Sequence, residues 1–329
     1  MDSFEGRIAV VTGGGTGMGR ELVAQLAADG CHVATCDVNA DPLAESVARA
    51  QAGAPEGTRV TAHTCDVSDA TAVDRFRDEV VDQHATDHVD LVFNNAGIGG
   101  GGSFLTRPRE EWDRTFAVDW GGVYNCCRAF VPLLVAGTDG YLVNTSSVNG
   151  FWASLGPGVP HTAYSAAKFA VKGFSEALIE DFRVNAPHVK VAVVMPGHVG
   201  TDIVINSRRA HGASEPEDMD ADELAEARAL ITARGFPANA LGDDGVRAMI
   251  RAVGEGFRDT APLTAAEAAT IILDGVRKGD WRILVGDDAH ALDEAVRADP
   301  LRAYDGQRLL IEVLGGPVGT GSQGSAAAT

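Results

Sequence analysis

The feature that most constrains the fold of this chain is a regular alternation of short apolar segments with longer segments of helical periodicity. The apolar segments are rich in β-branched residues and lack a polar face, which is typical of strands buried on both sides. They are residues 7–11, 32–36, 59–65, 89–93, 140–145, 190–194 and 281–285. Apolar residues at helical spacing fill the intervals, over residues 18–29, 42–51, 70–84, 108–135 and 164–184. This order predicts an α/β fold in which helices cover both faces of a parallel sheet.

Residues 203–262 interrupt the alternation. The segment is acidic and contains two amphipathic stretches, residues 220–233 and 243–257. Because structureless insertions of this length are rare in compact domains, we expect a helical lid over a substrate site.

A helix at residues 264–278 and the strand at 281–285 then resume the pattern. We therefore expect a single catalytic domain over residues 1–314, with the lid as an insertion. Residues 315–329 are small and polar, which predicts a flexible tail.

The charge of the chain limits its partners. A formal charge of −19 on 329 residues argues against nucleic acid and anionic membranes, because both need clustered Lys and Arg. No apolar run approaches the roughly 18–20 residues of a bilayer span, and the first residues lack the regions of a signal peptide. We expect a cytoplasmic protein whose partner is a small molecule.

The spacing of the cysteines indicates neither a metal site nor disulfide bonds. Cys31, Cys36, Cys65, Cys126 and Cys127 form no CxxC pair and no disulfide framework. We expect reduced thiols and no metal.

A glycine-rich turn follows the first expected strand and precedes the first expected helix. Such a turn lets the backbone approach a pyrophosphate and directs free amides and a helix dipole at it. A flexible turn without a ligand would look similar, but its place at the first strand–helix junction favours a dinucleotide. The candidate contacts are Thr12, Gly13, Gly15, Thr16, Gly17, Met18 and Gly19.

Asp37 ends the second expected strand, at the separation from the turn where a carboxylate can bind the adenine ribose hydroxyls. A carboxylate there repels a 2′-phosphate, and neither Thr16 nor Val38 offers a compensating positive charge. NAD is therefore expected in preference to NADP. The alternative is an ordinary acidic turn residue.

The TGxxxGxG spacing of the turn differs from the commoner GxGxxG form and resembles that of the short-chain dehydrogenase/reductases. Further motifs of that family follow in family order and extend the resemblance over roughly residues 5–202. They are Asp66-Val67, Asn94-Asn95-Ala96-Gly97, Ser147, Tyr164-x-x-x-Lys168 and Pro196-Gly197-x-Val199-x-Thr201.

The resemblance implies a seven-stranded, doubly wound, Rossmann-like sheet. It also implies that Asp66 and Val67 border the adenine and that Thr201 lies near the nicotinamide carboxamide. The further cofactor contacts that it implies are Asn95, Ala96, Gly97, Pro196, Gly197 and Val199, with Tyr164 and Lys168. A homodimer or homotetramer built on residues 108–135 and 164–184 is implied as well.

Tyr164 and Lys168 lie four residues apart in an expected helix, so their Cβ atoms are roughly 5–6 Å apart on one face. A tyrosine that acts as a base near neutrality needs its pKa lowered by about 2–3 units. One ammonium about 5 Å away supplies roughly 3 kcal/mol at an effective dielectric near 20. We therefore expect Lys168, helped by the charge of an oxidised nicotinamide, to lower the pKa of Tyr164.

Ser147 ends the fifth expected strand, where a hydroxyl can hydrogen-bond a substrate oxygen. The resemblance assigns this role to Ser147 and leaves Ser146 structural. In the expected oxidation, Tyr164 removes the hydroxyl proton, Ser147 orients the oxygen, and Lys168 also holds the nicotinamide ribose.

Asp119 departs from the family pattern, which usually has an asparagine there that anchors a proton-relay water. A buried, unpaired carboxylate is costly, so Asp119 should be hydrogen-bonded, with Lys168 as a candidate partner. A relay role and a purely structural role both remain open.

A mostly apolar pocket is expected between the lid and the long loop at residues 150–162. Candidate substrate contacts are Phe151, Trp152, His161 and His198, although a lone histidine is more often a packing or surface residue. The expected reaction interconverts a secondary alcohol and a ketone of a hydrophobic small molecule. Two other functions remain open, namely a non-catalytic nicotinamide-binding regulator and an epimerase or dehydratase that oxidises its substrate transiently.

Overall fold

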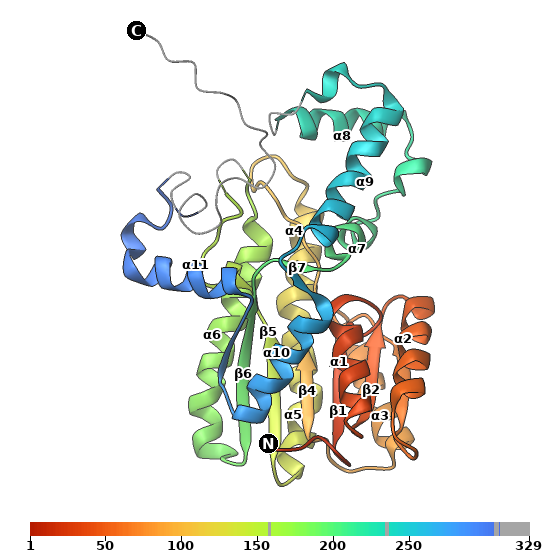
Figure 1. Cartoon of the computed structure of the whole chain (residues 1–329), viewed down its shortest axis with the longest axis vertical. Coiled ribbons are helices and arrows are strands. Elements are labelled where there is room, and N and C mark those ends of the chain that lie inside the picture. Colours follow the sequence, from red (N-terminus) through yellow and green to blue (C-terminus); the bar gives the residue numbers. More distant parts are fainter. Residues whose placement is uncertain (157–158, 234–236, 306–308, 310–329) are drawn as a thin grey trace.

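The computed structural model describes residues 1–156, 159–233, 237–305 and 309. Seven parallel strands form one sheet in the order β3-β2-β1-β4-β5-β6-β9 (Figure 1). The strands are β1 (Ile8–Thr12), β2 (His32–Asp37), β3 (Val60–Thr64), β4 (Leu91–Asn94), β5 (Gly140–Thr145), β6 (Val189–Pro196) and β9 (Arg282–Val285). The predicted seven-stranded, doubly wound sheet is confirmed.

The strand order reverses at β1, which pairs with β2 on one side and β4 on the other. The connections after β1 and β4 therefore run in opposite directions and leave a crevice at the carboxyl ends of these strands, where ligands bind in such sheets. The glycine turn follows β1 and the Asn94–Gly97 segment follows β4, so both border this crevice.

Helices cover both faces of the sheet (Figure 1). One core layer joins the sheet to α1 (Gly17–Ala28), α2 (Ala40–Gly53) and α10 (Ala265–Lys278). The other joins it to α3 (Ala70–His84), α5 (Gly122–Ala136) and α6 (Thr162–Asn185). Phe76 of α3 and Phe130 of α5 meet edge to face in the second layer, with ring centroids 5.2 Å apart. Among the residues described, no helix combines the length and apolar character needed to cross a membrane.

The helix predicted over residues 108–135 is divided into three parts. These are α4 (Arg109–Phe116), a π-helical turn η1 (Ala117–Gly121) and α5. A π-helical turn holds one residue more than an α-helical turn and is often found at functional sites. It carries Asp119, which is fully buried.

Residues 203–262 are called the insert from here on, and their described part, which leaves out residues 234–236, is mostly helical. They contain α7 (Ile203–Ala210), η3 (Pro216–Asp218), α8 (Ala221–Ala233), η4 (Ala238–Ala240) and α9 (Asp243–Asp259). Strand β7 (Val199–Gly200) pairs with β8 (Leu263–Thr264), so the chain leaves and re-enters the main body at one place. Figure 1 shows α8 and α9 standing beyond the end of the sheet. Met219, Leu224 and Val246 form a small separate core there. Helix α7 was not predicted individually.

Helix α11 (Asp287–Ala298) was also not predicted. It packs near η2 (Val148–Gly150), the turn that follows β5 and Ser147. Arg282 of β9 donates to both carboxylate oxygens of Asp293, at 2.8 and 2.5 Å. This pair anchors α11 to the edge of the sheet. The predicted tail, residues 315–329, lies outside the described residues.

We expect Asp293→Asn to lower the free energy of unfolding by about 2 kcal/mol, because it leaves a largely buried Arg282 without its counter-charge. The Arg282 hydrogen bond lowers the pKa of Asp293. The contribution of this ion pair to the free energy of unfolding is therefore complete above the unfolded-state pKa of roughly 4. It is lost as the pH falls through the lower folded-state pKa. Urea unfolding at pH 7 and pH 3 tests this, and the loss of stability in Asp293→Asn should shrink at pH 3.

The control is Asp305→Asn, which breaks an exposed pair with Arg302 and should change the free energy of unfolding by less than about 0.5 kcal/mol. An equal loss in both variants would contradict the anchoring role.

Candidate active site

The glycine turn between β1 and α1 is closed so tightly that side chains cannot enter it. Gly13 has a φ of +68°, and a Cβ there would lie 2.8 Å from the Cα of Ala96. A Cβ on Gly19 would lie 2.0 Å from the carbonyl oxygen of Gly13 and 2.7 Å from Nδ2 of Asn95. The turn therefore exposes its backbone at the crevice.

Hydrogen bonds join the end of β1 to the segment after β4. The Thr12 hydroxyl accepts from the amides of Asn95 and Ala96, each at 3.0 Å. The Asn95 side chain donates to the Thr12 carbonyl, also at 3.0 Å. Thr12, Asn95 and Ala96 thus hold the two walls of the crevice at a set separation.

The start of α1 fits a pyrophosphate. Its first turn contains no acidic residue, and no side chain caps it. The amides of a first helical turn lack partners within the helix and attract anions. Met18 packs its side chain against the core, which leaves its main chain for a ligand. Gly17 has a φ of +53° and approaches Thr201, whose Cγ2 would lie 3.1 Å from a Cβ on Gly17.

Asp37 is held at the end of β2. Its Oδ2 accepts from the amide of Gly15 and its Oδ1 from the amide of Asn39, both at 3.0 Å. Arg20 is a nearby cation that the sequence reasoning did not consider. Its Nε donates to the Gly15 carbonyl at 2.8 Å, and its Nη2 donates to the Pro42 carbonyl at 3.3 Å. The Nε and Nη2 atoms of Arg20 are thus both bonded to main-chain carbonyls, while the Asp37 carboxylate is fixed beside the glycine turn.

The other expected cofactor residues lie at the same end of the sheet. After β3, Asp66 accepts from Arg114 at 2.9 Å, and the carbonyl of Val67 accepts from Asn125 at 2.9 Å. After β6, which ends at Pro196, Gly197 donates to the carbonyl of Val285 at 3.0 Å, and Val199 is buried in β7. A Cβ on Gly97 would lie 2.6 Å from Oδ1 of Asp119.

Tyr164, Lys168 and Ser147 come together where α6 meets the end of β5. Lys168 Nζ lies 5.3 Å from the centroid of the Tyr164 ring and donates to the carbonyl of Thr145 at 3.2 Å. Ser147 accepts from the amide of Asn149 at 3.1 Å, and its hydroxyl is placed to hydrogen-bond Tyr164. The neighbouring Ser146 is turned away, because its hydroxyl donates to the Lys168 carbonyl at 2.7 Å.

Asp119 lies beside Lys168, with its Oδ1 3.4 Å from Nζ. The same oxygen accepts from the amide of Ile98 at 3.0 Å. The buried Oδ2 has no hydrogen-bond partner among the described residues. The expected pairing of a buried Asp119 with Lys168 is therefore present.

The balance of charge around Tyr164 differs from the expected one. Burial raises the pKa of Tyr164 above its usual value, and the Lys168 ammonium opposes that rise. The Asp119 carboxylate raises the pKa further, whereas the hydrogen bond with Ser147 lowers it. In the protein without cofactor, burial and Asp119 together raise the pKa of Tyr164 by more than Lys168 lowers it. The expectation considered the Lys168 ammonium but neither desolvation nor Asp119.

The four candidate substrate residues have different surroundings. The His161 ring stacks on the Tyr164 ring, with centroids 4.4 Å apart, and burial lowers its pKa to about 4. His198 contacts the base of the insert, with Nε2 2.7 Å from the carbonyl of Phe257. Phe151 lies under the guanidinium of Arg282, and Trp152 is buried against α11 and donates to the carbonyl of Ala303 at 2.8 Å. Of the four, His161 is the one in direct contact with Tyr164.

Sequence reasoning missed three residues at the start of the insert. Asn206 of α7 donates to the Thr16 hydroxyl at 3.1 Å. Ser207 accepts from the amide of Gly99 at 2.6 Å, and His211 Nε2 lies 2.9 Å from the Gly99 carbonyl. These contacts dock α7 on the glycine turn and on the loop after β4. They join residues about 100 or more positions apart, and no local spacing signals them.

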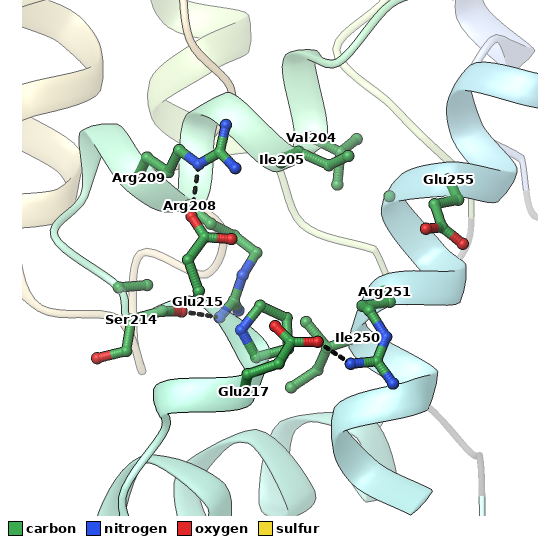
Figure 2. Close-up of a pocket in the computed structure, with 13 residues that line it drawn as sticks. Val204, Ile205, Arg208, Arg209, Ser214, Glu215, Glu217, Ile250, Arg251 and Glu255 are labelled. Carbon is green, nitrogen blue, oxygen red and sulfur yellow. Dashed lines mark hydrogen bonds and ion pairs between the residues drawn. The ribbon is translucent and has the colours of Figure 1, made fainter. Parts of the chain in front are cut away.

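A hollow of about 180 Å³ lies between α7, η3 and α9 (Figure 2). Val204, Ile205 and Ile250 form its apolar part. Arg209 and Arg251 line it as well, paired with Glu215 and Glu217 respectively. None of Ser147, Tyr164 and Lys168 lines this hollow, so it is a feature of the insert.

Gly19→Ala should destabilise the protein by more than about 2 kcal/mol and abolish dinucleotide binding, because the added methyl group overlaps the Gly13 carbonyl. Thermal unfolding with and without NAD measures both effects. Gly256→Ala is the matched control, since its Cβ on α9 would meet nothing within 4 Å, and it should be neutral or stabilising by up to about 1 kcal/mol. Normal stability and NAD binding in Gly19→Ala would show that the turn is not the binding element.

Comparison with known proteins gives consistent results. The model of the short chain dehydrogenase family matches residues 7–212. A Mycobacterium tuberculosis protein named as an oxidoreductase, SadH, is 36% identical over 298 residues, which are 90% of this chain and 92% of that protein.

Two solved structures bear on the cofactor. A short-chain dehydrogenase/reductase from Burkholderia phymatum in complex with NAD has a TM-score of 0.70 and 25% identity, and the match covers 98% of this chain and all of that one. A metagenomic short-chain oxidoreductase in complex with NADP has a TM-score of 0.52 and 30% identity, with 59% and 83% covered. The family thus binds NAD or NADP. With its crevice, glycine turn and Ser147–Tyr164–Lys168 cluster, the chain belongs to the short-chain dehydrogenase/reductase family of oxidoreductases.

Proposed function

We propose that the chain is an NAD-dependent oxidoreductase that interconverts a secondary alcohol and a ketone of a hydrophobic small molecule. The observation that carries the proposal is the cluster in which Lys168 Nζ lies 5.3 Å from the Tyr164 ring, with Ser147 beside it. These are a proton donor or acceptor, a cation that stabilises its ionised form, and a hydroxyl for the substrate oxygen.

The crevice residues fit a dinucleotide. The open first turn of α1 would hold the pyrophosphate, and Asp37 would accept hydrogen bonds from the adenine ribose hydroxyls. Asp66 and Val67 would border the adenine, and Thr201 would lie toward the nicotinamide. A bound nicotinamide supplies or accepts the hydride. The fixed Asp37 carboxylate disfavours a 2′-phosphate, which supports NAD over NADP.

The chemical step at the protein side chains is a proton transfer. In oxidation, Tyr164 takes the proton from the alcohol oxygen while Ser147 donates a hydrogen bond to that oxygen. In reduction, the Tyr164 proton passes to the carbonyl oxygen, and Lys168 stabilises the tyrosinate left behind. Lys168 is 2% exposed, so water screens its charge little at the tyrosine.

The surroundings of Tyr164 support an uncharged, apolar substrate. His161 stacks on the tyrosine, and because burial lowers its pKa to about 4, its ring is neutral at pH 7. The insert has eleven acidic and seven basic residues, and this net negative charge somewhat disfavours anions. We also propose a cytoplasmic homodimer or homotetramer. Its support is the aromatic face of η1, α5 and α6, where Trp120 and Phe174 meet edge to face and Tyr124 is 46% exposed.

Thermal unfolding at increasing concentrations of NAD and of NADP tests the cofactor assignment. We expect NAD to raise the midpoint by mass action and NADP to have little effect. Asp37→Ala should weaken NAD binding about tenfold or more, because it removes charge-assisted hydrogen bonds. Asp41→Ala, an exposed carboxylate in the first turn of α2, serves as the control and should leave binding unchanged. Tighter binding of NADP to the wild-type chain would overturn the assignment.

Turnover is tested with a panel of secondary alcohols and ketones, followed by absorbance at 340 nm. Tyr164→Phe should lower kcat by a factor of about 10²–10⁴, since it removes the proton that is transferred, and a remaining NAD-dependent thermal shift shows that the crevice still forms. Tyr124→Phe should keep full turnover. Undiminished turnover in Tyr164→Phe would refute the assignment of the general acid/base.

A further inference from the structure

Asp119 is the most unusual charged residue in the catalytic cluster. It is 0% exposed and lies in a π-helical turn, and its Oδ1 is 3.4 Å from Lys168 Nζ. Burial of a carboxylate costs several kcal/mol unless it is paired and hydrogen-bonded. A buried Asp119 carboxylate therefore acts electrostatically on the ionisable groups beside it.

Burial raises the pKa of the Asp119 carboxyl above its usual value, and its contacts with Lys168 and Ile98 oppose that rise by favouring the ionised form. Its Oδ1 accepts from the Ile98 amide at 3.0 Å and lies 3.4 Å from Lys168 Nζ. A Cβ on Gly97 would lie 2.6 Å from this oxygen and 3.2 Å from Nζ, so a glycine is needed for the two groups to approach. Both donors point at one oxygen, as a carboxylate accepts them.

The charged groups around the cluster are few. Lys168 faces Asp119 from α6, and His211 at the end of α7 lies near enough to act on it electrostatically. Tyr164 is faced by Lys168, Asp119, the neutral His161 and the Ser147 hydroxyl. Within the described part of the chain, these groups act together with burial to decide whether Tyr164 holds its proton.

A carboxylate in this place offsets the cation on which tyrosine ionisation depends. In a buried site, the fields of Lys168 and Asp119 act on Tyr164 with opposite sign and little screening. We propose that the Asp119 carboxylate, held against Lys168, is a positioning residue that offsets the charge of the lysine and so makes Tyr164 harder to ionise. The inference rests on the proposed function for its catalytic meaning, but its physical content concerns Tyr164 alone.

The consequence is a pH dependence that differs between the two directions of reaction. Reduction needs the Tyr164 proton, which moves to the carbonyl oxygen as the hydride reaches the carbon. Oxidation needs the tyrosinate, which accepts the proton of the alcohol. Oxidation therefore rises only at alkaline pH, and Asp119 moves that rise to higher pH, while reduction at neutral pH is supported by the protonated tyrosine.

The ionisation of Tyr164 can be measured without cofactor or substrate. Tyrosinate absorbance near 295 nm is titrated in the full-length protein, and the same titration of the Tyr164→Phe form is subtracted to isolate Tyr164. With Asp119→Asn, which keeps shape and removes the charge, the Tyr164 midpoint should move to lower pH by about one unit. Asp113→Asn removes an exposed carboxylate six residues earlier, on α4, and should leave the midpoint unchanged. An unchanged or higher midpoint in Asp119→Asn overturns the proposal.

The wild-type protein provides a measurement that does not depend on whether the variant folds. Carbon-13 NMR of aspartate carboxyl groups shows whether each is ionised. A carboxyl resonance coupled to the Ile98 amide that is ionised at pH 7 supports the proposal, and one that is protonated at pH 7 overturns it.

Measurements of turnover distinguish a failure of the Asp119 role from a failure of the proposed function. In an active enzyme, the alkaline rise of kcat/KM for oxidation should shift to lower pH in Asp119→Asn by the same amount as the Tyr164 titration. A chain that shows the titration shift but turns over no alcohol or ketone would refute the proposed function and leave the role of Asp119 intact. A chain that is active but shows no shift would refute the role of Asp119 alone.

Discussion

The hydrogen bonds of Thr12 with Asn95 and Ala96 are the interaction on which the site depends. A parallel sheet that reverses its strand order opens a crevice, but only a link between the ends of β1 and β4 sets the width of that crevice. The tight glycine turn, the free amides of α1 and the Asp37 carboxylate are all placed relative to this link. The cofactor half of the site therefore follows from one local connection between two strands.

The catalytic half depends on how α6 is fixed to the sheet. Asn94 donates to Asn144 at 2.8 Å, and Asn144 donates to Ser175 of α6 at 3.0 Å, in a fully buried row. Lys168 is held in turn by the carbonyl of Thr145. Buried polar groups that are satisfied only in one arrangement restrict a helix to that arrangement. In this way the strand order that opens the crevice also brings Tyr164 and Lys168 to its edge.

Patterns of short range predicted most of the fold. The seven strands and the main helices follow from hydrophobic periodicity, which reports burial on the scale of a few residues. The same periodicity placed one continuous helix over residues 108–135, where the structure has a π-helical turn at Asp119. It also did not identify α7 or α11 individually, since both are short amphipathic helices whose partners lie far away in the chain. The residues of α7 that contact Thr16 and Gly99 carry no local signal.

The sequence by itself determined the order of the strands and helices, the glycine turn and the set of groups available for catalysis. These are properties of neighbouring residues and of their spacing along one helix or strand. Only the tertiary structure decided the electrostatic balance at Tyr164, because that balance sums burial, Lys168, Asp119 and Ser147, which come from separate elements. A helical spacing of four residues predicts that Lys168 approaches Tyr164. It carries no information on the desolvation of the tyrosine or on the carboxylate that a distant π-helical turn places beside the lysine.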